Sequence, residues 1–289
     1  MAMEPAAQCF EDRDGGIGWT VDDRPGRVLE AFFAGYDRAF ILPDEKEDLA
    51  GFQACLGLNG RKFPFAPWPV RELVMIGQDQ PGGPVLAGAN FLATLIGGRI
   101  AVALNYAYVE PAARGRGLLR RVLGAVEQAS RAALDRMSAP VTLFIEQNDP
   151  LRLSAEHYAA DSAFSGIDQV DRLAVWARMG AKLVDLDYVQ PPLSAGQQAD
   201  GALVYAALRH DGPGLPGEFL AAHLTSFFGI SVLKGIDPVT SREAAAQIDA
   251  VRQAGTVRLL PMEPPIAALR QDPPPADGSL IALARRLSA

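Results

Sequence analysis

The sequence predicts an α+β (α/β) fold in which helices flank a mixed, mostly antiparallel sheet that contains one splayed parallel strand pair. Two observations lead to this prediction. The β-rich runs 85–96 and 99–109 are joined by Gly97-Gly98, and glycines accept the positive φ angles of a tight hairpin turn. The second run is followed by a helical pattern and then by the apolar run 141–146, which is the order of a right-handed parallel crossover.

The N-terminal elements follow from periodicity and helix-end signals. Residues 1–24 are polar and rich in Gly and Asp, and we expect a loose lead-in or a short edge strand there. Apolar residues recur at helical spacing over 27–40, and acidic residues in a first turn predict a second helix over 43–56. A strand over 70–76 then begins the antiparallel meander. The first helix should contribute an aromatic cluster to the core: Phe32, Phe33, Tyr36 and Phe40.

The later elements are predicted in the same way. We expect a helix from Gly115 to about 137, a short buried strand over 141–146, a helix over 168–179, strands over 182–188 and 202–208, helices over 216–229 and 241–253, a strand over 256–260, a Pro-rich linker over 261–278 and a small terminal helix. The elements group into a lead-in (1–24), a core domain (25–210) and a C-terminal α/β extension (211–289) packed on that core.

Composition excludes several classes of function. The net charge of −7 argues against a general nucleic-acid binder, since such proteins carry a basic surface. Cys9 and Cys55 have no metal-like spacing, so we expect neither a disulfide framework nor a metal cofactor. The first residues lack a signal-peptide pattern, and the longest apolar region, 85–109, is interrupted by polar residues. We therefore expect a cytoplasmic protein without a membrane or nucleic-acid partner; homodimer formation is left open.

The most informative segment, 102–123, combines an apolar strand, a turn through Pro111 and a helix that begins with an R-G-R-G run. Four arginines crowd the start of this helix: Arg114, Arg116, Arg120 and Arg121. Cations are unfavourable there because the N-terminus of a helix already carries a partial positive charge and unpaired N–H groups. The arrangement becomes favourable when a phosphate binds, so the segment predicts a phosphate site.

The loop Val109–Leu119, VEPAARGRGLL, resembles the V-x-P-x-x-R-G-x-G-x-G/A loop of the GNAT superfamily of acyl-CoA-dependent N-acyltransferases. Only Leu119 departs from that pattern. The resemblance implies a GNAT-like sheet, and transfer of an acyl group from acetyl-CoA or another acyl-CoA to a small-molecule amine. It also implies which main-chain groups hold the coenzyme A diphosphate, namely those of Arg114, Gly115, Arg116, Gly117, Leu118 and Leu119.

The same resemblance implies that the main chain of Tyr108 and Val109 pairs with the pantetheine arm, and that the thioester lies where strands 102–109 and 141–146 part. A second family signature is a tyrosine that protonates the leaving thiolate, and here Trp176 occupies its position. An indole is not a useful acid at neutral pH. Asn148 matches a family asparagine but lies 176 − 148 = 28 residues before Trp176, which indicates an inserted loop over 149–170.

Candidate catalytic residues each have a plainer alternative. Glu146 is the first candidate for the general base, although a solvated strand end is the more ordinary role. Asn105 could hold the acceptor amine or merely satisfy neighbouring main-chain groups. Tyr158, together with His157, could supply acid and base, or lie on a surface loop. Glu110 should pair with a nearby arginine, while His210 and His223 are expected on the surface or on a helix face.

Two other interpretations compete with an acyltransferase. The first is a catalytically weak or inactive acyl-CoA-binding or sensor protein, which the missing tyrosine favours. The second takes Gly115 and Gly117 as part of a dinucleotide fingerprint. It fails because Arg120 stands where the third glycine is needed, and because the glycines follow a hairpin strand rather than open the first parallel unit.

Overall fold

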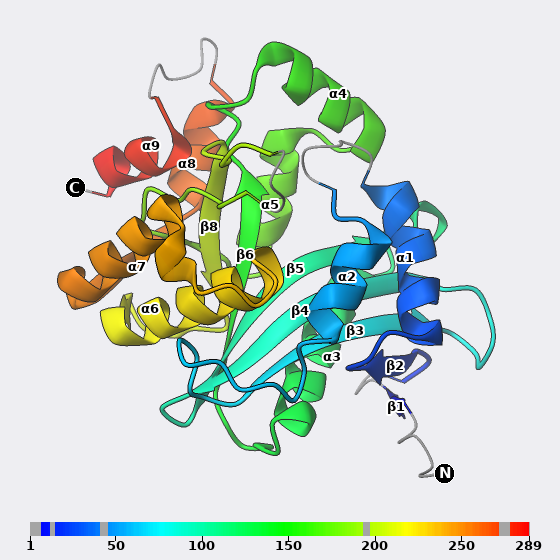
Figure 1. Cartoon of the computed structure of the whole chain (residues 1–289). Helices are drawn as coiled ribbons and strands as arrows, with labels where there is room; N and C mark the ends of the chain where they lie inside the picture. Colours follow the sequence, from blue (N-terminus) through cyan, green and yellow to red (C-terminus); the bar gives the residue numbers. More distant parts are fainter. Residues whose placement is uncertain (1–6, 12–14, 41–45, 193–196, 272–277, 289) are drawn as a thin grey trace. The chain divides into compact units, whose positions relative to one another are not determined.

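The computed structural model describes residues 7–11, 15–40, 46–192, 197–271 and 278–288 (Figure 1). The chain forms two compact units. Unit 1 comprises residues 1–63 and 67–140, and unit 2 comprises residues 64–66 and 141–289. This division lies inside the segment 25–210, so the predicted core domain and its C-terminal extension stay predictions.

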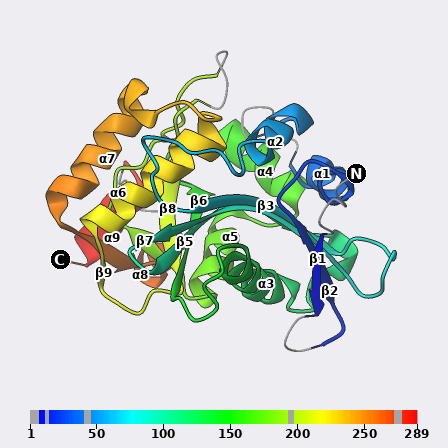
Figure 2. The ribbon, with the colours of Figure 1, turned by 60° about the horizontal axis from the view of Figure 1, so that its bottom comes forward.

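Unit 1 is built on an antiparallel sheet in the order β1-β2-β3-β4-β5. Its strands are β1 (Gln8–Glu11), β2 (Gly18–Asp22), β3 (Val70–Gln78), β4 (Ala87–Ile96) and β5 (Arg99–Val109). Its helices are α1 (Arg27–Ala39), α2 (Leu49–Leu56) and α3 (Leu118–Ala133). Helices α1 and α2 cover one face of this sheet and α3 covers the opposite face (Figure 2). The predicted meander is thereby confirmed.

The aromatic cluster of α1 forms the core beneath that helix, as predicted. Phe32 and Tyr36 are fully buried, and Phe33 and Phe40 pack against them from partly buried positions. The Phe52 ring of α2 meets Tyr36 edge-on, with ring centroids 5.0 Å apart. Edge-on aromatic pairs add about 0.5–1.5 kcal/mol each beyond the area they bury. The cluster therefore fixes α1 and α2 on the sheet.

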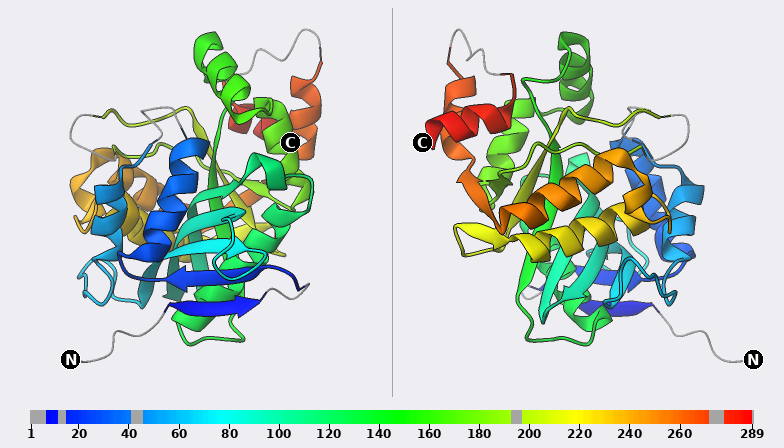
Figure 3. Two further views of the ribbon diagram at one scale, coloured as in Figure 1. Left: turned by 90° about the vertical axis from the view of Figure 1, so that its right-hand side faces the viewer. Right: turned by 60° about the vertical axis from the view of Figure 1, so that its left-hand side comes forward.

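Unit 2 contains a second antiparallel arrangement, in the order β6-β8-β7-β10-β9. Its strands are β6 (Val141–Asn148), β7 (Lys182–Val184), β8 (Leu203–Leu208), β9 (Gly214–Pro216) and β10 (Thr256–Pro261). Its helices are α4 (Ala155–Ser165), α5 (Gln169–Arg178), α6 (Gly217–Ser226), α7 (Arg242–Ala254), α8 (Glu263–Leu269) and α9 (Leu280–Leu287). Helices α6 and α7 lie side by side (Figure 3, right).

The fold class predicted from the sequence is confirmed: helices flank mostly antiparallel strands. The splay of strands 102–109 and 141–146 concerns the placement of one unit against the other and stays a prediction. Within the described ranges, no helix is both long and apolar enough to cross a membrane.

Several elements were predicted with wrong bounds; helix α3, for example, ends at Ala133 instead of about 137. Helix α2 begins at Leu49, because the Asp48 carboxylate accepts a hydrogen bond from the Gly51 amide (2.7 Å) and caps the helix there; residues 41–45 lie outside the described ranges. Strand β7 ends at Val184 instead of 188. The predicted linker contains helix α8, whose prolines lie in its first turn, where a missing N–H costs nothing.

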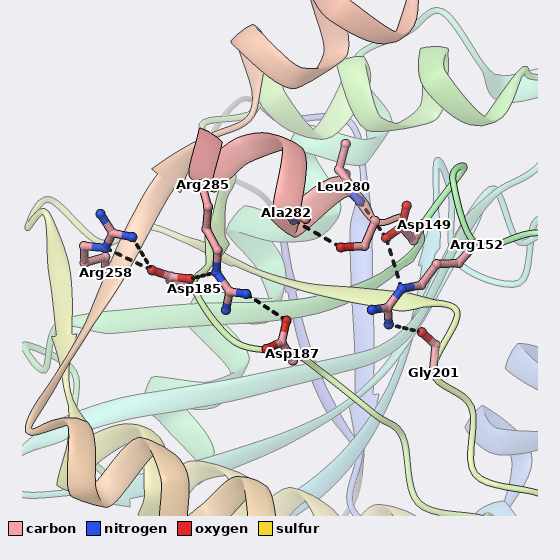
Figure 4. A network of polar contacts seen from close by, with 10 residues as sticks. Asp149, Arg152, Asp185, Asp187, Gly201, Arg258, Leu280, Ala282 and Arg285 are labelled. Atoms are coloured by element: carbon pink, nitrogen blue, oxygen red, sulfur yellow. Dashed lines mark hydrogen bonds and ion pairs between the residues drawn. The ribbon is translucent and has the colours of Figure 1, made fainter. Parts of the chain in front are cut away.

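Helix α9 is fastened to the rest of unit 2 by a polar network (Figure 4). The Asp149 carboxylate, 1% exposed, accepts hydrogen bonds from the amides of Leu280 (2.8 Å) and Leu151 (3.0 Å). Near the other end of the helix, Arg285 donates to Asp185 (2.6 Å) and Asp187 (3.0 Å). The buried carboxylate thus replaces the acceptor that the N-terminal amide of α9 lacks.

Substitution of this carboxylate, Asp149→Ala, is expected to lower the free energy of unfolding by about 2–3 kcal/mol, because it leaves buried amides without an acceptor. Chemical denaturation followed by circular dichroism measures the change. The matched control is Asp187→Ala, which removes a carboxylate with 67% exposure from the same network and should stay within about 0.5 kcal/mol of the wild type. Equal losses in the two variants would contradict the assigned role of Asp149.

Candidate functional site

The glycine loop begins where β5 ends. Pro111–Ala113 form one turn of 3₁₀ helix, in which the Ala113 amide donates to the Glu110 carbonyl (2.8 Å). The Ala113 side chain on one side of the loop and the Leu118 side chain on the other are 1% and 2% exposed. Both flanks are therefore anchored in the core of unit 1, and the residues between them lie on the surface.

Gly115 and Gly117 adopt left-handed backbone conformations, with φ angles of 77° and 71°. A Cβ atom built on either residue would have no other atom within 4 Å. Any other residue would cost about 1–2 kcal/mol in this conformation. The glycines therefore leave open space in front of the loop and allow a ligand to approach the main chain closely.

Main-chain amides of the loop have no acceptor in the part of the chain that the structure describes. Gly117 is the N-cap of α3 and makes no side-chain capping bond; the first amides that find an acceptor are those of Arg120 (3.1 Å) and Arg121 (3.4 Å), both to the Gly117 carbonyl. The amides that precede them belong to Gly115, Arg116, Gly117, Leu118 and Leu119. Together with the positive end of a 16-residue helix, these donors form a receptor for an anion.

The four arginines of the loop are not equivalent. Arg121 donates to the Gly15 carbonyl (2.7 Å), and the Arg114 Nε lies 3.5 Å from the Val109 carbonyl oxygen. The side chains of Arg116 and Arg120 are exposed beside the loop amides. Of the four arginine side chains, these two can most easily reorient toward a bound phosphate.

The register of β5 distinguishes the two residues expected to pair with pantetheine. The Glu110 amide donates to the Leu86 carbonyl (2.9 Å) on the neighbouring chain segment, and Tyr108 lies opposite Gly88 of β4. Because hydrogen-bonded pairs alternate along an antiparallel ladder, the main-chain groups of Tyr108 face β4 and those of Val109 face away from it. Val109 therefore has the orientation that a bound arm requires.

The ring of Tyr108 holds the end of β5 in place. The phenol donates to the Phe32 carbonyl (3.1 Å), and a Cβ on Gly35 would lie 2.2 Å from the phenol oxygen, while one on Gly88 would lie 2.7 Å from a ring carbon. Burial raises the pKa of this phenol above its usual value. The packed ring fixes the end of β5 just before the loop.

Glu110 pairs with Arg38 at the end of α1 (2.5 Å), which confirms the predicted pairing with an arginine. Asn105, by contrast, lies at an irregularity of β5, in contact with Asn90 of β4 and Glu72 of β3. Glu72 and Asn90 were not predicted as site residues from the sequence. The available signal was a carboxylate and an amide inside otherwise apolar strands.

Glu146 lies on β6 of unit 2 and is held by two side chains. The Tyr188 phenol donates a short hydrogen bond to its carboxylate, and the Gln190 Nε2 lies 3.3 Å from it. Burial raises the pKa of Glu146 to about 7, and the hydrogen bond from Tyr188 opposes this shift. A carboxylate with a pKa near 7 can accept a proton at neutral pH. The predicted base candidate thus has suitable chemistry.

Tyr158 lies in α4, and its phenol donates to Asp168 (2.7 Å), the residue that caps α5. Burial raises the pKa of Tyr158 to about 12, so the phenol holds its proton tightly. His157 is exposed in the first turn of α4. Trp176 is buried in α5. The local contacts of Tyr158 therefore give it a structural role in joining α4 to α5.

Of the two positions predicted for His223, the helix face is observed and the surface is not, since the residue lies on the buried face of α6. Its side chain is fully buried, its Nε2 lies 2.7 Å from the Tyr205 hydroxyl, and its ring stacks on Phe144 with centroids 4.0 Å apart. Burial lowers the pKa of His223 to about 3, so the imidazole is neutral. The sequence could not indicate this, because the aromatic partners come from other strands.

Metal ligation has no candidate site among the residues that the structure describes, since no three His, Cys, Asp or Glu side chains cluster there. The site that remains is the glycine loop, with the residues of β5 that lead into it.

No protein-family model and no curated protein matches this chain. Solved structures do match. A protein described as an acetyltransferase from the GNAT family of Bacteroides thetaiotaomicron is 14% identical; the match covers 72% of this chain and 92% of that one, with a TM-score of 0.45. The ribosomal-protein-S18-alanine N-acetyltransferase of Escherichia coli is 16% identical over 68% of this chain and 98% of that one, with a TM-score of 0.35.

An aminoglycoside 6'-N-acetyltransferase complexed with coenzyme A is 14% identical, with coverages of 68% and 98% and a TM-score of 0.39. The chain is thus similar, at low identity, to N-acetyltransferases of known structure, one of them described as a member of the GNAT family.

Proposed function

We propose that this chain transfers an acyl group, acetyl in the simplest case, from coenzyme A to a small-molecule amine. One observation carries the proposal: the loop of residues 115–119 offers five consecutive amides without an acceptor among the described residues, at the start of α3. Two of these residues are glycines with open space around them. A diphosphate matches such a row of donors in charge and in hydrogen-bonding capacity.

Residues of β5 and of the loop that follows it would bind different parts of acyl-CoA. The loop amides and the exposed Arg116 and Arg120 would bind the diphosphate. The main chain of Val109 would pair with the pantetheine arm as an added strand does, which aligns the thioester with β5. An N–H near Val109 would donate to the thioester oxygen as negative charge develops there.

In the reaction, the amine nitrogen forms a bond to the thioester carbon and the carbon–sulfur bond breaks. The amine gives up one proton, and the thiolate takes one to become free coenzyme A. We assign acceptance of the amine proton to Glu146, because a pKa of about 7 suits a general base at neutral pH. Trp176 has no acidic proton to give, so the thiolate leaves without help from that position.

A second candidate function is an acyl-CoA-binding or sensor protein without turnover. The contacts of Tyr158 favour it, because its phenol donates to Asp168 and has a pKa of about 12. The absence of a tyrosine does not by itself exclude an enzyme, because the thiolate can leave unassisted. The two functions are distinguished by thiol release from acetyl-CoA that depends on an amine, which only the enzyme shows.

Calorimetric titration of the whole chain with coenzyme A tests the loop. We expect a dissociation constant between about 1 μM and 1 mM, the range usual for enzyme substrates. Pantetheine is the matched control ligand, since it lacks the diphosphate, and should bind at least about tenfold more weakly. Equal affinity for the two ligands, or no binding of coenzyme A, would contradict the proposal. Amine-dependent release of thiol from acetyl-CoA then separates the enzyme from the sensor.

A further inference from the structure

A buried polar cluster crosses three strands of unit 1. Glu72 on β3 and Asn90 on β4 are 1% and 2% exposed, whereas Asn105 on β5 is partly exposed. The Glu72 Oε1 accepts hydrogen bonds from the Nδ2 groups of Asn90 (2.7 Å) and Asn105 (3.0 Å). The Asn105 Nδ2 also donates to the Asn90 Oδ1 (3.0 Å). The three side chains therefore form one connected network.

The network fixes the orientation of the Asn105 amide. Its Nδ2 faces two acceptors, and rotation by 180° would place Oδ1 against a carboxylate and a carbonyl oxygen, which repel it. The Asn90 amide is fixed in turn, because its Nδ2 donates to Glu72 and to the Leu73 carbonyl (3.0 Å). The Asn105 Oδ1 consequently has to face away from the cluster.

This oxygen is a buried acceptor that finds no donor within the described residues. A buried polar atom without a partner costs about 1–3 kcal/mol, and such atoms are rare unless they serve a function. The atom would be satisfied by an N–H group of a bound molecule.

A β-bulge places Asn105 in this position. Ala103 pairs with Leu92 and Tyr106 pairs with Asn90, so β5 has one more residue than β4 between these pairs. A bulge bends the strand and changes the direction of its side chains, and bulges are common beside active sites. The backbone of Glu72 is fixed as well, since its amide donates to Asn59 (2.9 Å).

The cluster lies within reach of a ligand that extends from the glycine loop along β5. Asn105 precedes Val109 by four residues, which corresponds to about 13 Å along a strand. A substrate bound by its diphosphate at the loop and extended along β5 would bring its far end toward Asn105.

We propose that the Asn105 Oδ1 accepts a hydrogen bond from the N–H of the acceptor amine, and that Glu72 and Asn90 are positioning residues that hold the amide in this orientation. The inference rests on the proposed function. It specifies the acceptor as a neutral amine with at least one N–H available for Asn105 beyond the proton that is lost in the reaction. Primary amines meet this requirement, whereas secondary amines, whose single N–H is the proton that is lost, do not.

The test uses the whole chain, acetyl-CoA and three primary amines, namely tyramine, spermidine and glucosamine, of which the best acceptor is carried forward. Asn105→Leu removes the acceptor oxygen at nearly constant volume. We expect it to raise the KM for the amine at least tenfold, with the KM for acetyl-CoA unchanged. Asn105→Ser repeats the test with a shorter side chain if the leucine variant does not fold.

Glu72 is tested by a conservative pair of variants. Glu72→Leu should raise the amine KM as Asn105→Leu does, whereas Glu72→Gln keeps an oxygen for the Asn105 Nδ2 and should stay within about threefold of the wild type. Thr94→Val is the matched control: it removes another fully buried oxygen, on β4, that has no partner among the described residues, and should leave both KM values unchanged.

The outcomes separate the two proposals. Turnover by Asn105→Leu with an unchanged amine KM overturns the inference and leaves the proposed function standing. Wild-type protein that binds coenzyme A but releases no thiol with any of the three amines overturns the enzymatic function, and the inference with it. A loss of coenzyme A affinity in Asn105→Leu also overturns the inference, because it would place the effect at the loop.

Discussion

The substitution Gly117→Trp is expected to abolish coenzyme A binding, with a rise in the dissociation constant of at least about 100-fold, or about 2.7 kcal/mol. The space around a Cβ at this position is open, so the indole would occupy the volume in front of the loop amides that the diphosphate needs. A residue with a side chain also costs about 1–2 kcal/mol at a φ of 71°. Calorimetric titration gives the affinity, and thermal unfolding gives the stability.

Two matched glycines separate these effects. Gly124 is exposed on α3, with no atom within 4 Å of a Cβ and without a positive φ, so Gly124→Trp adds the same ring to the same helix. Gly60 is exposed in unit 1 with a φ of 80°, so Gly60→Trp adds the same backbone strain away from the loop. Both variants should bind coenzyme A as the wild type does. An unchanged affinity in Gly117→Trp would remove the loop from the proposed function.

Glu146→Gln is expected to lower kcat by about 10²–10⁴-fold, the usual contribution of a general base, with coenzyme A affinity unchanged. The wild-type rate should rise with pH through an apparent pKa of about 7, because the carboxylate must be ionised to accept a proton. The variant should lack this rise. Rates measured from pH 5 to pH 9 test both expectations. The control Glu218→Gln neutralises a carboxylate with 77% exposure and should leave the profile unchanged.

Stability supplies a second readout for Glu146 that does not depend on catalysis. Burial raises the pKa of this carboxyl from 4.5 to about 7, so the folded state holds the proton more tightly than the unfolded state does. The stabilisation from this group is therefore complete below pH 4.5 and is lost as the pH rises through 7. Glutamine does not titrate, so the variant should become more stable relative to the wild type over this interval. A constant difference across pH would mean that the pKa of Glu146 is close to its usual value.

Local sequence signals predicted the three helices of unit 1 and the strands β3, β4 and β5, because these helices have a periodic face or an end signal, whereas β1 and β2 lie within the predicted lead-in. Gly97-Gly98 predicted the hairpin between β4 and β5, and the spacing of Phe32 and Tyr36 predicted the buried face of α1. Boundaries were predicted less well. The start of α2 at Leu49 is decided by one hydrogen bond to Asp48, and many acidic residues nearby offer the same signal.

The hydrogen-bond partners of the polar candidate residues were the main omission. Glu72 lies 33 residues before Asn105, and Glu146 lies 42 residues before Tyr188, its hydrogen-bond donor. His223 was expected on the surface or on a helix face because no charged residue is close to it in sequence, yet its partners are aromatic residues of β6 and β8. Such partners are brought together by strand register, and a one-residue change of register would turn each side chain to the other face.

The sequence by itself determined the glycine loop: the strand before it, the glycines that allow a ligand to approach the main chain, and the helix whose first amides lack acceptors. These properties depend on backbone geometry within about ten residues, so the residue types predict them directly. Only the tertiary structure decided that Asn105 is held by Glu72 and Asn90, and that burial raises the pKa of Glu146 to about 7. Orientation and burial depend on neighbours from distant strands, because packing, and not local conformation, sets the hydrogen-bond partners and the polarity around each side chain.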